Sequence, residues 1–550
     1  MRLPALVEMI CCARISCPWA FSRVLTLGIS KYLLSVAAML AVCGCALKPD
    51  DPGKLAPDMP RRFSAGVAGA APPVSMRWPS LFGSRELTAL SRAALEGNFD
   101  LEAAVARILQ ADAQARIAGA ALYPQIGASG NASRRLSPGT TRSPSPPFRA
   151  SVSNSFSLGL SASYILDFWG RNARLAEAGK LNAIASRHDY DTLSIATLAT
   201  LSNAYFQVLV AQERLRYARS NIRSATQTLD AIKARVAVGT NTALDVAQQE
   251  SIVANQRANV PILEQQVQQS RNLIAVLLGR TPQSMRVRGG SLSSLRLPRV
   301  RPGLPSQLLL RRPDLAAAEA RLKAAGANIV AARAALYPAI TLTGETSLAS
   351  QTLRNLLRPE AIGAAVAGSV AQSIFSGYEL EGQVELSLAR RDELLASYRQ
   401  TVLSALSDVE NALVAIRKTA EQERLRAAAV RSAETAANIT RQRLREGTID
   451  VVTLLNTQQT LFNARDALTL VRFQRLQAIV SLFQALGGGF SQEPGRERER
   501  AGKAVAKKPS NDEKSGSRLW PASFPQFKPA DPAAGHQAAP QMRSKVMTGR

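Results

Sequence analysis

The sequence predicts an α+β membrane protein whose 550 residues carry an internal two-fold repeat. The motif Ala-Ala-Leu-Tyr-Pro occurs twice, ending at Pro124 and at Pro338. Each copy follows an Ala-rich helical stretch and precedes a run in which apolar residues alternate with small polar ones. Long helical patterns follow these runs, and the first is free of proline from Gly170 to Pro261. A chain that uses one plan twice indicates a repeat architecture.

The first residues, 1–44, are predicted to be an export signal. Lys31 precedes the apolar run Tyr32–Val42, which is too short to cross a membrane as a mature helix. Gly44 stands directly before Cys45, as in a bacterial lipobox, so Cys45 is the predicted lipidation site. Cys43 is the weaker candidate, because the bulky Val42 precedes it, and an ordinary cleaved signal is the other alternative. No later stretch has about 18 or more apolar residues, so no transmembrane helix is expected, and membrane spanning would need a closed β-barrel.

Residues 45–83 are rich in proline and are predicted to form a lipidated tether and equatorial segment. The first repeat is predicted at 84–279. Its opening helix ends at Tyr123 and Pro124, because proline lacks the N–H that a helix needs and favours an extended residue before it. From Val152 onward, apolar residues hold most even positions and small polar residues the odd ones, which indicates a strand with one apolar face. The elements predicted in this repeat are strands at about 124–136 and 151–166 and long helices at about 172–238 and 242–278.

The second repeat is predicted at 313–490, after an equatorial linker at 280–312. Tyr337 and Pro338 mark its helix-to-strand joint, in the same way as the first Tyr-Pro pair. The elements predicted in this repeat are strands at about 338–349 and 362–374 and long helices at about 379–446 and 450–486.

The predicted elements require an oligomer. Two repeats give four strands, whereas about eight strands is the small end for a membrane barrel. Three copies would supply twelve strands, so we expect a homotrimer with one shared 12-stranded β-barrel, whose closure removes strand edges that lipid cannot satisfy. The long helices have a narrow apolar seam with near-heptad spacing, typical of helices that pack side by side. We expect them to continue the barrel as a long α-helical barrel.

The composition disfavours several other functions. The net charge is +27, but no compact basic patch or binding motif accompanies it, so a solvated Arg-rich surface is preferred over nucleic-acid binding. The chain has two histidines, and its five cysteines all lie in the first 45 residues. No metal site, cofactor or enzyme activity is therefore expected. Residues 491–550 are predicted to be a disordered basic tail.

Four motifs carry a resemblance to a known family. They are Leu310–Glu319 at a helix start, Leu166–Arg171 and Ile374–Gly377 at two strand-to-helix joints, and Leu476–Gly489 at the closing helix. Together they resemble the TolC-type outer-membrane factor family, in the lipoprotein branch of RND efflux systems, which includes NodT/OprM-like proteins. The resemblance extends from about Cys45 to Phe490.

The resemblance implies the outer-membrane channel of a tripartite efflux pump. Such a protein forms a trimeric conduit from the periplasm to the exterior for drugs or other small toxic compounds. It is lipid-anchored, inserted in the outer membrane as a barrel, and extends into the periplasm. Its partners are outer-membrane lipid, a periplasmic adaptor (membrane fusion protein) and an inner-membrane RND-type pump. The alternatives are a TolC-type exit duct for type I protein secretion and, less favoured because of the alternating strands, a periplasmic coiled-coil lipoprotein without a pore.

The resemblance also places a periplasmic mouth at the two turns between long helices, where glycines supply left-handed caps. The candidate adaptor contacts are Gly239, Thr240, Gly447 and Thr448. Family members commonly have an apolar ring residue and aspartates just after the second turn, and in this chain the candidate gate residues are Val452, Thr453, Asn456 and Asp450. We expect Val452 and Asn456 to form the constriction, with an uncharged ring that does not bind cations. Asp450 and Asp245 have a second interpretation as helix N-terminal caps.

Trp169 has two interpretations. It either anchors the barrel at the membrane interface or fills the junction between barrel and helices, and the second is preferred.

Overall fold

The computed structural model describes residues 55, 57–64, 74–137 and 151–490. The predicted signal, Cys45 and the predicted tail lie outside the described residues. The α-helices are α2 (Arg85–Gly97), α3 (Phe99–Ala120), α4 (Arg171–Ala237), α5 (Ala243–Leu277), α6 (Leu308–Arg311), α7 (Pro313–Ala334), α8 (Glu379–Arg445) and α9 (Val451–Ala485). The strands are β1 (Gln125–Ser137), β2 (Ser151–Leu166), β3 (Ala339–Ser350) and β4 (Ile362–Ala371). Short 3-10 helices are η1 (Trp78–Phe82), η2 (Pro282–Ser284), η3 (Leu292–Ser294), η4 (Pro305–Gln307), η5 (Leu353–Asn355) and η6 (Pro359–Ala361).

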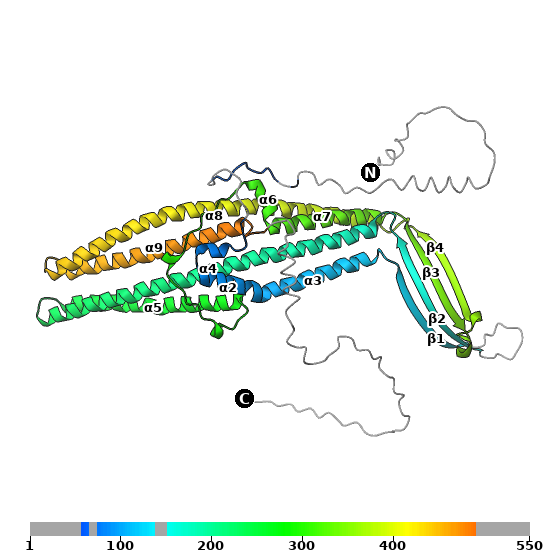
Figure 1. The fold of residues 1–550 in the computed structure, drawn as a ribbon, viewed down its shortest axis with the longest axis horizontal. Coiled ribbons are helices and arrows are strands. Elements are labelled where there is room, and N and C mark those ends of the chain that lie inside the picture. Colours follow the sequence, from blue (N-terminus) through cyan, green and yellow to red (C-terminus); the bar gives the residue numbers. More distant parts are fainter. Residues whose placement is uncertain (1–54, 56, 65–73, 138–150, 491–550) are drawn as a thin grey trace, which may run out of the picture. The chain divides into compact units, whose positions relative to one another are not determined.

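The two halves of the chain have the same order of elements. The first is α3, β1, β2, α4 and α5, and the second is α7, β3, β4, α8 and α9. The matching helices have equal lengths: 22 residues in α3 and α7, 67 in α4 and α8, and 35 in α5 and α9. A helix of 67 residues is about 100 Å long, because each residue adds about 1.5 Å. Figure 1 shows the α4–α5 and α8–α9 hairpins side by side, with their turns at one end of the long helices and the strands beyond the opposite end, where α4 begins.

The four strands form one antiparallel sheet in the order β1-β2-β3-β4. β4 is shorter than expected, since it ends at Ala371 and the prediction continued to residue 374. Ala371 pairs with Ala339, the first residue of β3, and the residue before it is Pro338. Because proline has no N–H to donate, the ladder has no further donor on this side and the strand ends there.

The sheet has two different faces. Register places Ile126 opposite Ala162 and Leu158 opposite Leu348, so the even-numbered residues of β1, β2 and β3 share one face, and β4 continues it. The exposed large apolar residues of that face are Ile126, Leu136, Val152, Leu158, Leu160, Leu342, Ile362, Val366 and Val370. The odd-numbered face consists mostly of Ser, Thr, Gly and Ala. The sheet therefore presents an apolar surface on one side and a polar one on the other.

The main hydrophobic core joins the beginning of the described chain to its end. Trp78 and Phe82 of η1 are fully buried, and Trp78 stacks on Phe483 of α9 with ring centroids 5.0 Å apart. Phe206 of α4 packs against Phe82, with ring centroids 5.0 Å apart. The contacts fix the base of both hairpins to the segment that precedes α2, so the long helices have a common rigid origin.

Two buried or part-buried carboxylates hold the predicted linker against the helices. Glu213 of α4 is 4% exposed and accepts hydrogen bonds from the Leu292 N–H and the Ser291 hydroxyl. Glu86 of α2 accepts from the N–H groups of Arg288 and Gly289. Because a buried carboxylate is costly without donors, these bonds fix the path of the linker.

Among the described residues, one helix has a stretch that could cross a membrane by length and composition alone, whereas no such stretch was expected. This helix is α4, and 72% of the stretch is buried inside the protein. α4 packs against α3, α5, α7 and α9, which explains its apolar character as that of a core helix.

Candidate functional site

The two hairpin tips are built alike. Gly239 and Gly447 have positive φ values of 76° and 71°, which glycine adopts without the steric cost of a Cβ. The N–H and hydroxyl of Thr240 both donate to the carbonyl of Arg235, and those of Thr448 both donate to the carbonyl of Arg443. These bonds satisfy carbonyls at the ends of α4 and α8. The four candidate contact residues, Gly239, Thr240, Gly447 and Thr448, are all exposed at the tips.

The two acidic residues near the tips cap the returning helices. Asp450 accepts a 2.9 Å hydrogen bond from the Thr453 N–H at the start of α9. Asp245 forms a capping box with Thr242 at the start of α5. Hydrogen bonds from the Thr453 side chain and backbone hold the pKa of Asp450 below its usual value, and the backbone and hydroxyl of Thr242 do the same for the pKa of Asp245. Asp450 and Asp245 therefore both act as helix N-terminal caps in the structure, and a gating role for Asp450 stays a prediction.

The other candidate gate residues lie on one exposed face of α9. Val452, Thr453 and Asn456 are exposed, and Val452 is 41% accessible. Leu454 and Leu455 between them are buried, as is Val451. The first turns of α9 therefore turn one face toward the protein and present the candidate gate side chains on the other.

A small apolar cluster joins the hairpins at the tips. Ile232 of α4 is 1% exposed and packs with Val451 and Leu455 of α9. Beside it, the Arg235 guanidinium donates a 2.9 Å hydrogen bond to the Leu444 carbonyl in the last turn of α8. A cation at this position also interacts favourably with the helix C-terminus. Opening the tip between α4 and α9 requires separating this cluster.

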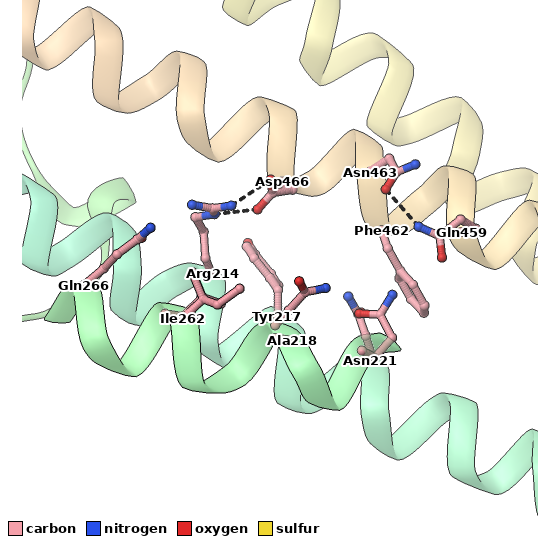
Figure 2. Close-up of a pocket in the computed structure, with 13 residues that line it drawn as sticks. Arg214, Tyr217, Ala218, Asn221, Ile262, Gln266, Gln459, Phe462, Asn463 and Asp466 are labelled. Carbon is pink, nitrogen blue, oxygen red and sulfur yellow. Dashed lines mark hydrogen bonds and ion pairs between the residues drawn. The ribbon is translucent and has the colours of Figure 1, made fainter. Parts of the chain in front are cut away.

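Farther from the tips, the hairpins enclose a cleft of about 240 Å³ between α4, α5 and α9. Figure 2 shows Arg214 of α4 and Asp466 of α9 facing each other across it. Arg214 Nε lies 2.6 Å from Asp466 Oδ1, and Nη2 lies 3.2 Å from Oδ2, which is a bidentate pair. Burial raises the pKa of Tyr217, with a further contribution from the nearby Glu213 carboxylate. The remaining polar lining is mostly amides: Asn221, Gln256, Asn259, Gln266, Gln459 and Asn463.

The helix-to-strand joints contain an aromatic stack. Trp169 lies 4.9 Å from Tyr337 between ring centroids, and its Nε1–H donates a 2.8 Å hydrogen bond to the Pro338 carbonyl. This contact supports the junction interpretation of Trp169. At the other joint Tyr123 is 71% exposed, and the turn that contains it leads through Pro124 into β1.

Next to this stack, Asp167 caps α4. Its two carboxylate oxygens accept hydrogen bonds from the Asn172 and Ala173 N–H groups. Gly170 precedes the helix with a φ of 74°.

Sequence reasoning missed the residues that connect the two hairpins. Neither the Ile232 cluster, nor the Arg214–Asp466 pair, nor the hydrogen bond from Arg235 to the Leu444 carbonyl was predicted. No local pattern marks these contacts, because their residues are more than 200 positions apart. Within the described part of the chain, no group of three or more His, Cys, Asp and Glu side chains is placed to hold a metal ion.

Comparisons with known proteins place these features in a wider context. The sequence model of a family described as outer membrane efflux protein matches residues 90–280 and 304–488. The pyoverdine export outer membrane protein OpmQ of Pseudomonas aeruginosa is 38% identical, over 84% of this chain and 97% of OpmQ. The toluene efflux pump outer membrane protein TtgF of Pseudomonas putida is 31% identical, over 84% and 97% of the two chains. The open state of the Neisseria gonorrhoeae MtrE outer membrane channel has a similar structure, with a TM-score of 0.73 and 28% identity over 81% of this chain and 99% of MtrE.

Proposed function

The chain belongs to the outer membrane efflux protein family, and from this premise we propose that three copies form one conduit from the periplasm to the exterior. Membership confirms the resemblance and identifies the chain as the outer-membrane component of a tripartite efflux pump. The trimer, its shared barrel, its gate and its contacts with particular partners are the finer parts of the proposal.

The main observation in favour of a trimer is that the four-stranded sheet is open at both edges. β1 and β4 are its edges, and each pairs with a strand on one side only. Lipid offers no partner to the backbone groups of such an edge. Because the four strands alternate in direction, β4 of one copy can pair with β1 of the next and keep the antiparallel pattern. Three copies give a closed barrel of twelve strands, with the apolar face toward lipid.

The N-terminus supplies a second attachment to the outer membrane in this proposal. Acylation of Cys45 would add a lipid anchor to the inserted barrel, and such an anchor is strongest in combination with another membrane contact. The long helices then extend about 100 Å from the barrel into the periplasm.

The hairpin tips are the proposed contact with a periplasmic adaptor, which links the channel to an inner-membrane RND-type pump. The exposure of Gly239, Thr240, Gly447 and Thr448 at the ends of the hairpins supports this role. Cysteines placed at Thr240 and Thr448 should crosslink to the cognate adaptor in cells. Crosslinks that form only with cysteines at mid-helix positions would contradict the proposed docking.

The gate is proposed at Val452 and Asn456, on the exposed face of α9. Its test is single-channel conductance of purified trimer in a planar bilayer. Asn456→Ala should raise the conductance, because a shorter side chain widens a ring made by three copies. The matched control is Gln248→Ala, since Gln248 is exposed and occupies the same position in α5 as Asn456 in α9. Equal conductance of Asn456→Ala and wild type would exclude this residue from the constriction.

Transport in cells separates efflux from protein secretion. Deletion of the gene for this protein should raise the susceptibility of the cells to small toxic compounds, and expression of the wild-type chain should restore resistance. Loss of a secreted protein without any change in susceptibility would favour a type I exit duct instead.

A further inference from the structure

Charged side chains are rare in the sheet. The four strands contain Arg134 and Arg135 in β1 and Glu345 in β3, and no other charged residue. The two arginines lie near the end of β1, next to the β1–β2 connection. Glu345 is the seventh residue of β3, which has 12 residues, so it lies near the middle of the sheet.

The register places Glu345 on the polar face. Its Cα partners are Ser161 in β2 and Ala365 in β4. Thr343 and Ser347, two residues away along β3, share the same face because strand side chains alternate with a period of two. The exposed large apolar residues of the paired strands lie on the opposite face, apart from Ile165 at the joint. Glu345 therefore points away from the surface that suits lipid.

The carboxylate of Glu345 has no neutralising partner within the part of the chain that the structure describes. Its residue is exposed, and neither an ion pair nor a side-chain hydrogen bond connects it to another described residue. The basic residue on the same face, Arg135, is aligned with Ser153, whereas Glu345 is aligned with Ser161. Eight residues along β2 correspond to about 26 Å, which exceeds the Debye length of about 8 Å at physiological salt.

We propose that Glu345 sets the charge selectivity of the conduit by lining the barrel lumen with one carboxylate from each copy. This inference rests on the proposed trimeric barrel. Three equivalent carboxylates then form a ring on a wall of small hydroxyl-bearing, amide and apolar groups, with Arg135 as the basic strand residue near one end of that wall. The ring attracts cations and repels anions at a level far from the tips. Of the four candidate gate side chains there, Val452, Thr453 and Asn456 are uncharged, and the carboxylate of Asp450 caps α9. Lumen side chains tune selectivity in membrane barrels without affecting the lipid face.

The size of the effect follows from the barrel dimensions. Twelve strands about 4.8 Å apart, tilted by about 40°, close at a radius of about 12 Å, which leaves each carboxylate about 10 Å from the axis. In water, and screened by salt, three carboxylates at that distance by themselves favour a monovalent cation over an anion by about 20-fold at 0.01 M salt. The three Arg135 side chains reduce this preference, because the Debye length of about 30 Å at that salt exceeds their separation of about 26 Å from Glu345. The preference falls to about fivefold at 0.1 M and to nearly one at 1 M.

The experiment is the reversal potential of full-length wild-type trimer in a tenfold KCl gradient, measured at mean concentrations near 0.01, 0.1 and 1 M. The potential should have the sign of cation preference and should decline toward zero as the salt rises. Glu345→Gln keeps the shape of the side chain and should abolish the cation preference, so the reversal potential should fall to zero at high salt and to zero or the anion side at low salt, where Arg135 is the charged residue left on this face. Glu345→Lys should reverse the sign of the reversal potential at low salt.

The control is Glu360→Gln, which removes an exposed carboxylate of η6 in the connection between β3 and β4. It should leave the reversal potential unchanged. Conducting channels with the same cation preference in wild type and Glu345→Gln would overturn the role of Glu345 while leaving the conduit intact. Absence of conductance from correctly assembled wild type would instead overturn the conduit, and the inference with it.

Discussion

Substitution of Ile232 by alanine should loosen the tip of each subunit. Ile232 is 1% exposed and packs between the hairpins against Val451 and Leu455. Alanine lacks three of its carbon atoms. At about 0.8 kcal/mol for each buried methylene-sized group, the loss is about 2.4 kcal/mol, near the lower end of the range measured for such core truncations. Since about 1.4 kcal/mol is a factor of ten, the population with separated tips should rise about 50-fold.

Amide hydrogen exchange measured residue by residue is the direct assay. In Ile232→Ala, exchange should accelerate by up to about 50-fold at the first turns of α9, around Val451 to Leu455, and at the end of α4. The single-channel conductance should also rise, if separated tips widen the mouth. The base of the hairpins should keep its protection, because its core around Phe206 is unchanged.

A second buried substitution supplies the control. Val253 of α5 is 5% exposed and packs with Ala225 and Leu229 of α4, in a cluster whose buried members all belong to the first hairpin. Val253→Ala should accelerate exchange in α4 and α5 but leave α9 unaffected. The reasoning is refuted if α9 exchanges at the wild-type rate in Ile232→Ala, or if Val253→Ala accelerates it equally.

Three further predictions concern the tip, the joint and the anchor. Hydrogen bonds from Thr453 lower the pKa of Asp450, so the Asp450 carboxylate stabilises α9 fully when the pH is above the ordinary pKa of 3.8, and this stabilisation is lost as the pH falls through the lower pKa of the folded state. Asp450→Asn should therefore accelerate hydrogen exchange of the first α9 amides at pH 7, and the difference from wild type should vanish in strong acid. Trp169→Phe removes the hydrogen bond to Pro338 but keeps an aromatic ring, so it should cost about 1 kcal/mol and lower the temperature at which purified trimers dissociate on gels; an unchanged temperature would show that the bond does not hold the joint. Cys45→Ser should abolish incorporation of labelled palmitate, whereas Cys43→Ser should retain it, and the opposite pattern would move the lipidation site to Cys43.

Local chemistry explains why several boundaries could be anticipated from the sequence. The first long helix was expected at about 172–238 and occupies Arg171–Ala237. Its end depends on Gly239, whose positive φ allows the capping bonds, and therefore on a few consecutive residues. The alternation along β2 likewise reports which face is apolar without any knowledge of its neighbours. The end of β4 was missed because it depends on the pairing of Ala371 with Ala339 and on the proline that precedes Ala339.

The sequence by itself determined the repeated plan, the joints at Pro124 and Pro338, the helical turns and the amphipathic strands. It also carried the family resemblance, through motifs whose meaning is local. Only the tertiary structure decided that Ile232 meets Val451, that Arg214 pairs with Asp466, and that Glu345 lies on the polar face without an ion-pair partner among the described residues. The physical reason is that helix ends and strand alternation depend on residues a few positions apart, whereas these placements depend on how the hairpins pack and how the strands align.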